Sequence, residues 1–330
     1  MAVNVVEQLG LPRIDEHLAR VEVALTRSVT TEDRFLSQVA GHLAAAGGKR
    51  VRPAMVLAAS SAAGGSLDDD VIEGAVSVEL VHLGSLYHDD VMDEAEQRRG
   101  VASVNARWGN LVAVLVGDLL MARASEIAAA LGADIAALLA STIVDLCAGE
   151  VAQLEYSYDT GRDEQAYFRA ISGKTASLTA CATRMGAMVG GASKQDVGAL
   201  TTYGQAFGMT FQVWDDILDL VGTESQLGKP AGHDMVEGTY TLPVIRALAI
   251  PDVGGELKAL LGAPLDPPAR DKAKDLIIGS DAIASSVIEA RRWADRAAAA
   301  LEPLRGRGRD DAIDTMAAAG HLLIDDLDLV

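Results

Sequence analysis

The residues best suited to chemistry in this chain are two clusters of aspartates with the same i, i+1, i+4 spacing. The clusters are Asp89, Asp90 and Asp93, and then Asp215, Asp216 and Asp219. Residues four apart share one face of a helix, so the first and last acid of a cluster can reach a common cation. Carboxylate oxygens suit Mg²⁺, which usually keeps waters and substrate phosphates as its other ligands. Two clusters that face each other therefore predict a divalent-metal site for a diphosphate substrate.

Both clusters follow apolar segments with helical periodicity. Val71 to Leu86 precedes the first cluster, Phe207 to Trp214 precedes the second, and neither segment contains a proline. We therefore expect each cluster at the C-terminal end of a buried helix. A helix C-terminus already carries partial negative charge, so acids there are unfavourable unless a cation joins them. A solvated helix end is the alternative for one such cluster, but the repetition favours the metal site.

The composition favours closely packed helices. Hydrophobic residues make up 49% of the 330 residues, but aromatic residues only 4%, and alanine is abundant. No proline lies between Pro53 and Pro230, so this stretch predicts successive helices punctuated by glycines. No sustained alternation of apolar and polar residues predicts strands. The predicted fold class is all-α.

Charge, cysteines and hydropathy narrow the class of protein. The net charge of −19 excludes nucleic-acid binding, which needs a basic face. Cys147 and Cys181 lie in apolar helical contexts without CxxC spacing, so we expect both thiols in the core of a cytoplasmic protein. The segment from Met1 to Gly10 lacks a basic region before a hydrophobic stretch, and no uninterrupted apolar run reaches about 18 residues. We therefore expect a protein that is neither exported nor membrane-spanning.

A basic loop precedes one of the predicted helices. It has the sequence Gly47-Gly48-Lys49-Arg50-Val51-Arg52-Pro53. Three cations within four residues, beside glycines and just before a helix, are suited to bind an anion. The loop is not a Walker motif, because Leu43 stands where the first glycine is required. A basic turn between helices is the alternative interpretation.

Five motifs occur in the order found in one known family. They are the basic loop, the first aspartate cluster with Arg98-Arg99-Gly100, Lys174-Thr175, Phe211-Gln212 before the second cluster, and Gly228-Lys229-Pro230-x-Gly232-x-Asp234. Through these motifs the chain resembles the trans-isoprenyl (polyprenyl) diphosphate synthases, in particular the long-chain bacterial type. The likeness is clearest over residues 13–250 and becomes vague after Pro251.

The resemblance implies a fold and an activity. Members of the family are all-α bundles of roughly a dozen helices around a deep central cavity, usually paired as homodimers. We accordingly expect one domain over residues 1–330, with residues 251–330 forming C-terminal helices. Such enzymes add isopentenyl diphosphate head to tail to an allylic diphosphate. Their cofactor is Mg²⁺, with about three ions around the bound diphosphate.

The resemblance also implies residue roles. The expected direct Mg²⁺ ligands are Asp89, Asp93 and Asp215, supported by Asp90, Asp216 and Asp219. The residues expected to bind isopentenyl diphosphate are Lys49, Arg52, His82 and Arg99. The residues expected around the allylic diphosphate are Arg98, Lys174, Thr175, Gln212 and Lys229. No general base is expected, because the departing diphosphate takes the final proton in this family.

The first aspartate helix also carries a prediction about product length. In the family, short-chain enzymes place an aromatic ring at the positions of Gly84 or Ser85, and this ring forms a floor below the metals. Both residues are small here, and Val81 and Val78 further down the helix are modest aliphatics. We therefore expect an all-trans product of the hexaprenyl to decaprenyl class, of the sort used for a menaquinone side chain, with geranylgeranyl diphosphate as the alternative.

Two features depart from the family pattern, and three other functions fit the sequence less well. Thr239 stands where many relatives carry lysine, and Asp325-Asp326-Leu327-Asp328 differs in spacing from the two clusters, so we interpret it as a solvated tail. A class I terpene cyclase would not need the cations expected around a second diphosphate. A noncatalytic subunit would typically have lost one aspartate cluster. A purely structural bundle would leave the many buried charges unexplained.

Overall fold

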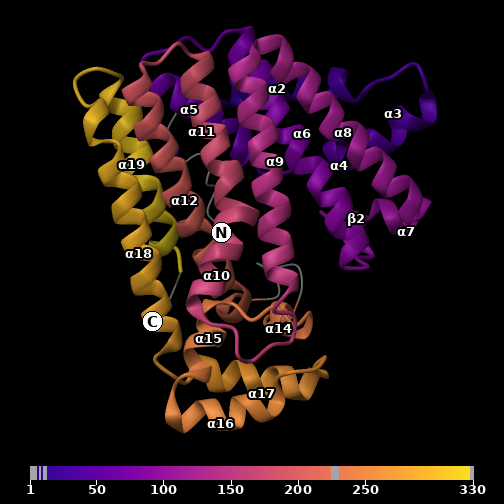
Figure 1. Cartoon of the computed structure of the whole chain (residues 1–330), viewed down its shortest axis with the longest axis vertical. Helices are drawn as coiled ribbons and strands as arrows, with labels where there is room; N and C mark the ends of the chain where they lie inside the picture. Colours follow the sequence, from indigo (N-terminus) through magenta and orange to yellow (C-terminus); the bar gives the residue numbers. More distant parts are fainter. Residues whose placement is uncertain (1–5, 7–8, 10–12, 224–229, 328–330) are drawn as a thin grey trace.

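The computed structural model describes residues 6, 9, 13–223 and 230–327. Within these residues the chain is almost entirely helical, and its strands form a single short ribbon. The longest helices run roughly along the long axis of the molecule, and α16 and α17 lie across its lower end in Figure 1. The all-α prediction is confirmed.

Five long helices form the body that positions the aspartate clusters. They are α6 (Asp69–Met92), α8 (Asn110–Leu131), α9 (Ala133–Leu154), α11 (Ser177–Val189) and α12 (Lys194–Val221). The most extensive packing joins α6 to α8, and α12 packs on both α11 and α18 (Ala282–Ala300). Mostly aliphatic and small side chains fill the space between them, together with Tyr87, Tyr203 and Phe207.

Shorter elements enclose this body. Before α6 these are α2 (Ile14–Val29), α3 (Arg34–Ala40), α4 (His42–Ala45) and α5 (Val51–Ala62). Between the long helices lie α7 (Val104–Trp108), α10 (Glu164–Ile171) and the π-turn η1 (Ser172–Ala176). After α12 come α14 (His233–Val236), α15 (Leu242–Leu248), α16 (Pro251–Leu260), α17 (Pro267–Ile278), the 3₁₀ turn η2 (Glu302–Leu304) and α19 (Asp310–Asp325). Because α19 packs on α5 as well as α18, the C-terminal helices also contact the N-terminal part of the bundle.

Hydrogen bonds at the helix ends place the two clusters. The Asp68 carboxylate accepts a hydrogen bond from the Val71 N–H (3.2 Å) and caps the start of α6. At the other end the Asp93 N–H donates to the Asp89 carbonyl (2.8 Å), so the first cluster closes the helix. The second cluster lies in the last turns of α12, before the C-cap Gly222. Both clusters are therefore at helix C-termini, as predicted.

A short β-ribbon follows the first cluster and was not predicted. Strand β1 (Gln97–Arg98) pairs antiparallel with β2 (Val101–Ala102). The turn between them has positive φ at both central residues, 54° at Arg99 and 75° at Gly100, which suits a two-residue hairpin. Two-residue strands are too short for an alternating pattern, so the hydropathy pattern gives no sign of them. The ribbon fixes the backbone of both arginines.

A π-turn places Lys174 against α9. The turn η1 has the wider i→i+5 hydrogen bonding that often marks functional sites. It lies against Gly149 of α9, where an added Cβ would be 2.2 Å from the backbone nitrogen of Lys174. The two elements can approach this closely only because residue 149 has no side chain.

Helix α9 exposes an unusual amount of apolar surface. Among the described helices it alone is long and apolar enough to cross a membrane by length and composition. Only 22% of its most apolar 18-residue stretch is buried. Asp145 and Glu150 interrupt the run, so no uninterrupted apolar segment marks it in the sequence. Both thiols were expected in the core. Cys181 is buried as expected, but Cys147 on α9 is exposed, so the prediction for Cys147 is wrong. Apolar periodicity does not distinguish a core face from an exposed one.

The close contact at Gly149 gives a test of the fold. We predict that Gly149→Ala lowers the free energy of unfolding by about 1–3 kcal/mol, because a Cβ there overpacks the contact with η1. Urea unfolding followed by circular dichroism measures this. The matched control is Gly198→Ala on α12, where an added Cβ meets no atom within 4 Å. The control should raise stability by up to about 1 kcal/mol, and similar destabilisation in both variants would contradict the explanation.

Candidate active site

The two aspartate clusters line a common polar cavity of about 320 Å³, here called the polar mouth. The predicted site residues in its wall are Asp89, Asp93, Arg98, Lys174, Thr175, Gln212, Asp215 and Asp216. It adjoins a largely apolar cavity of about 540 Å³, here called the apolar shaft. The two cavities are contiguous, because Asp89, Glu150 and Lys174 line both. The structure thus brings both clusters and most of the predicted allylic-site residues together.

The first cluster directs Asp89 and Asp93 into the mouth, in surroundings that disfavour their charge. Burial raises the pKa of Asp89 to about 6, and the nearby Glu150 and Asp93 carboxylates add to the rise. Burial likewise raises the pKa of Asp93, with Glu237 and Glu150 contributing. Lys174 opposes both shifts without cancelling them. A bound cation would relieve this repulsion.

Asp90 points away from the mouth and holds Arg98. Its buried carboxylate accepts a hydrogen bond from Arg98 Nε at 2.7 Å. Its backbone carbonyl accepts another from Asn105 Nδ2 at 2.9 Å, which ties the end of α6 to α7. Burial raises the pKa of Asp90 even though the arginine opposes the shift. This geometry fits the predicted supporting role, because Asp90 orients Arg98 in the wall of the mouth.

In the second cluster the three acids have different environments. Asp215 is exposed to the mouth. Asp216 is buried and accepts hydrogen bonds from the Tyr167 hydroxyl and from Gln212 Nε2 (2.8 Å), while burial and the nearby Asp234 raise its pKa. Asp219 is also buried, and its backbone carbonyl accepts the Gly232 N–H (2.7 Å). Asp216 is therefore placed to support the wall around Asp215. Asp219 is placed to hold the chain at Gly232.

Lys174 and Thr175 enter the mouth from η1. Lys174 Nζ lies 2.9 Å from a carboxylate oxygen of Glu150 on α9. Burial disfavours the ammonium charge, but Glu150 and the first cluster outweigh burial and raise the pKa of Lys174, so it stays protonated. The Thr175 hydroxyl donates to Gln212 Oε1 (2.7 Å), which continues the hydrogen bonds through Gln212 to Asp216. The π-turn thus couples both walls of the mouth.

The acids of the mouth fit a divalent metal that shares its coordination with a ligand. Carboxylates outnumber cations in the wall, and burial raises the pKa of both Asp89 and Asp93. Among the described residues no group of three His, Cys, Asp or Glu side chains converges into a complete metal site. Mg²⁺ typically takes one or two carboxylates and completes its coordination with water and phosphate oxygens, so these acids fit such an ion.

Arg50 of the basic loop does not serve an anion site. It lies in the left-handed region with φ 49°, and its guanidinium is buried in an ion pair with Glu79 (2.8 Å) and a second ion pair with Glu22. Burial raises the pKa of Glu79, although three arginines oppose the shift. This buried pair joins α2, α5 and α6 and holds the loop in place.

Of the four residues expected to bind isopentenyl diphosphate, two line the shaft and two do not. Arg52 and His82 line it, and Arg52 Nη1 donates to His82 Nε2 (3.3 Å). Burial, together with Arg52 and Arg99, holds the pKa of His82 well below its usual value, so the imidazole is neutral. Arg99 is anchored by backbone carbonyls, and a Cβ on Gly48 would lie 2.9 Å from its guanidinium carbon. Lys49 is exposed and lines neither cavity.

The shaft wall contains one of the four predicted chain-length positions. Ser85 lines it. Gly84 instead faces α8, where an added Cβ would lie 3.0 Å from the Gly117 carbonyl oxygen, because adjacent helical residues differ by about 100° around the axis. Val78 and Val81 are fully buried outside the shaft lining. Of the four chain-length positions, only Ser85 therefore lines the shaft.

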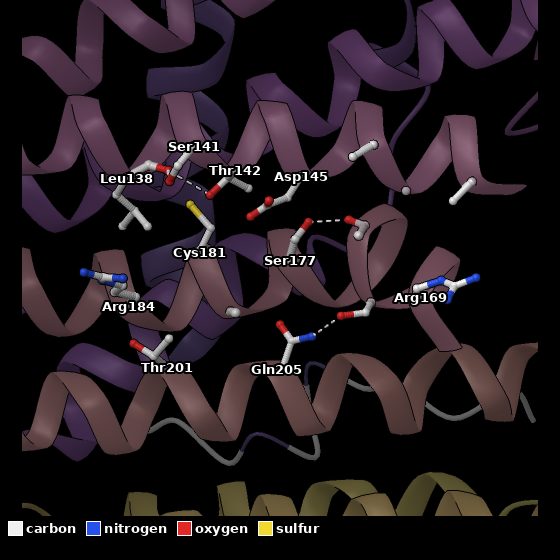
Figure 2. Close-up of a pocket in the computed structure, with 16 residues that line it drawn as sticks. Leu138, Ser141, Thr142, Asp145, Arg169, Ser177, Cys181, Arg184, Thr201 and Gln205 are labelled. Atoms are coloured by element: carbon white, nitrogen blue, oxygen red, sulfur yellow. Dashed lines mark hydrogen bonds between the residues drawn. The ribbon is translucent and has the colours of Figure 1, made fainter. Parts of the chain in front are cut away.

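A separate hollow of about 550 Å³ lies between α9, α11 and α12 (Figure 2). Hydroxyl groups line much of it, and Arg169 and Arg184 lie at opposite ends of the view. It contains none of the predicted site residues. The mouth and shaft, and not this hollow, are the candidate active site.

Three remaining predictions fall at the edge of the site or outside it. Lys229 lies outside the described residues. Thr239 lines the mouth, so the departure from lysine concerns the site itself. Asp325 and Asp326 are exposed at the end of α19, but Asp325 pairs with Arg291 and Leu327 is buried, so this segment is not simply a solvated tail; Asp328 lies outside the described residues.

Several residues of the mouth carry no motif signal. Glu150, Arg162, Tyr167 and Glu237 all line it, yet no motif includes them. Glu150 is one of few acids in the apolar helix α9, and this is the sequence signal that could have pointed to it. The position of Arg162 follows only from how the segment between α9 and α10 folds back over the mouth.

Comparison with known proteins agrees with this geometry. Residues 33–277 match the family model described as polyprenyl synthetase. The chain is 41% identical over 307 residues to heptaprenyl diphosphate synthase component 2 of Geobacillus stearothermophilus, covering 91% of this chain and 95% of the relative. It is 39% identical over 255 residues to nonaprenyl diphosphate synthase of Mycobacterium tuberculosis, covering 76% of each. The structure of a Caulobacter crescentus polyprenyl synthase complexed with calcium and isoprenyl diphosphate superimposes with a TM-score of 0.89 at 34% identity, covering 97% of each chain.

The geometry of the clusters predicts separable effects on activity and stability. Asp89→Ala and Asp215→Ala should each lower kcat about 100-fold or more, the scale of losing one electrostatic contact to a transition state. Neither should lower the melting temperature, because each removes a repelled charge from a helix C-terminus. Steady-state kinetics and thermal unfolding measure the two effects. Asp326→Ala at the exposed end of α19 is the control and should change neither; loss of helical signal in the cluster variants would argue for a structural role.

Proposed function

The chain belongs to the polyprenyl synthetase family, and we propose that it is a long-chain prenyltransferase. It adds isopentenyl diphosphate units head to tail to an allylic diphosphate and releases an all-trans polyprenyl diphosphate. The observation that carries this proposal is the pairing of two aspartate clusters across a polar mouth that continues into an apolar shaft of about 540 Å³. A charged diphosphate and an apolar prenyl chain need these two environments side by side.

The residues of the mouth account for the first step of the reaction. Cleavage of the allylic carbon–oxygen bond leaves a carbocation and a highly charged diphosphate. Lys174 and Arg98 place positive charge beside the oxygens that gain negative charge, where electrostatic stabilisation is most effective. Asp89, Asp93 and Asp215 would hold divalent ions, which would supply further positive charge to the same oxygens.

The second step needs the double bond of isopentenyl diphosphate beside the carbocation. Arg52, His82 and Arg99 lie next to one another, so they can hold this second diphosphate near the mouth. Placing the two reactants together contributes roughly 7–11 kcal/mol in favourable cases. The double bond attacks the carbocation, and the departing diphosphate accepts the proton that is then lost. No side chain is required as a general base.

Metal dependence is typical of the family, and the identity and number of the ions are a further proposal for this chain. We propose Mg²⁺ as the resident ion, with about three ions assembled around the bound diphosphate. The excess of carboxylates over cations in the wall of the mouth supports this.

The shaft supports a long product. Ser85 is the wall residue one turn below Asp89, and the described residues that line the shaft include no phenylalanine, tyrosine or tryptophan. A product of the hexaprenyl to decaprenyl class, such as a quinone side chain, is therefore favoured over geranylgeranyl diphosphate. A terpene cyclase is disfavoured by the second diphosphate site, and a noncatalytic subunit by the two intact clusters.

An exposed apolar face supports a homodimer. Six large hydrophobic side chains of α8 and α9 are exposed, namely Leu111, Val114, Leu115, Val144, Val151 and Leu154. Contiguous apolar surface of this kind marks an interaction site. Val114, Val151 and Leu154 also line the shaft, so a second copy of the chain on this face would cover the open side of the shaft. We propose this pairing, in a cytoplasmic protein, rather than insertion of α9 into a membrane.

The activity is tested by product analysis with labelled isopentenyl diphosphate, farnesyl diphosphate and Mg²⁺. Wild-type protein should make products of about 30 to 50 carbons, the hexaprenyl to decaprenyl class, and EDTA should abolish turnover. Ser85→Phe should shorten the product to farnesyl or geranylgeranyl length while retaining bond formation, because its ring would block the shaft.

The control for product length is Thr202→Phe, which places the same ring on an exposed position of α12. It should leave the product unchanged. Cyclised products without isopentenyl diphosphate would contradict the proposed activity. An unchanged product length in active Ser85→Phe protein would show that the chain does not pass this wall.

The dimer is tested by light scattering coupled to gel filtration. Wild-type protein should elute at twice the chain mass of 34.4 kDa. Val144→Glu should yield a monomer, because it buries a charge in the proposed interface. Val23→Glu on α2 is the matched control, since Val23 is similarly exposed, at 72% against 66% for Val144. A wild-type monomer that assembles only with a different polypeptide would contradict the homodimer.

A further inference from the structure

Arg162 is a buried cation in the wall of the polar mouth that no motif includes. The residue is only 4% exposed and lies in the segment between α9 and α10. Its Nη1 donates to the backbone carbonyl of Tyr240 at 3.1 Å. Nε and Nη2 are buried and have no hydrogen-bond partner in the described part of the chain. A buried guanidinium with two unused donors is unfavourable unless a ligand completes it.

No described carboxylate is hydrogen-bonded to Arg162, although the charge of Asp216 favours the guanidinium and partly offsets its burial. Its guanidinium carbon lies 5.6 Å from the centre of the Tyr167 ring, and the Tyr167 hydroxyl is already committed to Asp216. No described carboxylate forms an ion pair with Arg162, although Asp215 and Asp216 line the same cavity. Burial lowers the pKa of Arg162, but an arginine remains protonated in proteins. Arg162 therefore lines the mouth without an ion pair, and its Nε and Nη2 donors have no hydrogen-bond partner in the described part of the chain.

We propose that Arg162 binds the diphosphate of the allylic substrate through Nε and Nη2. The planar guanidinium fork matches two phosphate oxygens at once, which a lysine ammonium cannot do. The bond to Tyr240 also holds Arg162 beside Thr239, which lines the same cavity. Arg162 thus supplies, from the segment between α9 and α10, the positive charge that Thr239 does not carry. This inference rests on the proposed function and deepens it.

A purely structural role for Arg162 makes a different prediction. In that case Arg162 would only tie the segment before α10 to the carbonyl of Tyr240 and to the Tyr167 ring. Its loss would lower the melting temperature but leave ligand affinities unchanged. The two roles are therefore separated by binding measurements on folded protein.

The experiment compares wild type with Arg162→Gln, which keeps an N–H donor for Tyr240 but removes the charge. Binding of inorganic pyrophosphate in the presence of Mg²⁺ is measured by calorimetry, and KM is measured for both substrates. We expect the Kd for pyrophosphate and the KM for the allylic diphosphate to rise about 10- to 100-fold, the scale of a charged hydrogen bond. The KM for isopentenyl diphosphate should change less than about twofold, since Arg52 and Arg99 hold that substrate.

Arg162→Lys is the second variant, because it keeps the charge and loses only the fork. It should bind pyrophosphate better than Arg162→Gln and less well than wild type. Addition of Thr239→Lys to Arg162→Gln should restore much of the lost affinity, since it returns a cation to the same cavity. Failure of both lysines to improve binding over Arg162→Gln would overturn the assignment.

The matched control is Arg246→Gln on α15. Arg246 pairs with Glu164 and donates to the Ser285 carbonyl, so it is structural and lies outside the mouth. It should lower the melting temperature without changing either KM. Unchanged pyrophosphate affinity and KM values in Arg162→Gln, with wild type active, would overturn the inference alone. A wild type that neither elongates nor binds pyrophosphate would overturn the proposed function and this inference with it.

Discussion

Mutual repulsion among carboxylates at the C-terminal ends of two helices is the constraint on which the site depends. Asp89 and Asp93 sit where the helix dipole is already unfavourable to negative charge, and burial raises their pKa further. Asp215 faces them across the same cavity. Within the described residues Lys174 and Arg98 oppose this repulsion without removing it, so we infer that metal ions together with an anionic substrate complete the site.

The packing around the site serves to hold that repelled arrangement in place. Asp90 points away from the cavity and accepts a hydrogen bond from Arg98, whereas Asp216 lies in the cavity wall and accepts hydrogen bonds from Tyr167 and Gln212; these bonds fix the walls. The close approach of η1 to α9 brings Lys174 between the clusters. Below this charged layer the lining becomes aliphatic, so the reacting diphosphate and the growing prenyl chain are kept in different environments.

The sequence predicts the parts of this arrangement that follow from spacing within one helix. The i, i+1, i+4 spacing and the preceding apolar segments place both aspartate clusters correctly at helix ends. The same reasoning fails for Gly84, whose direction depends on where α8 packs, and for Cys147, whose exposure depends on a face of α9 that the rest of the chain leaves uncovered. Arg50 looked like part of an anion site but is turned inward by Glu79, a partner 29 residues away. Arg162 gave no signal, because its role arises only from tertiary contacts.

We infer that the aspartate clusters bind metal ions together with a diphosphate and do not bind the metal ions before the diphosphate. Calorimetric titration of Mg²⁺ into the protein, with and without inorganic pyrophosphate, tests this most directly. The arrangement predicts weak Mg²⁺ binding by the protein alone and much tighter uptake of more than one ion once pyrophosphate is present. Tight Mg²⁺ binding that is independent of pyrophosphate, or tight pyrophosphate binding without any divalent ion, would contradict it.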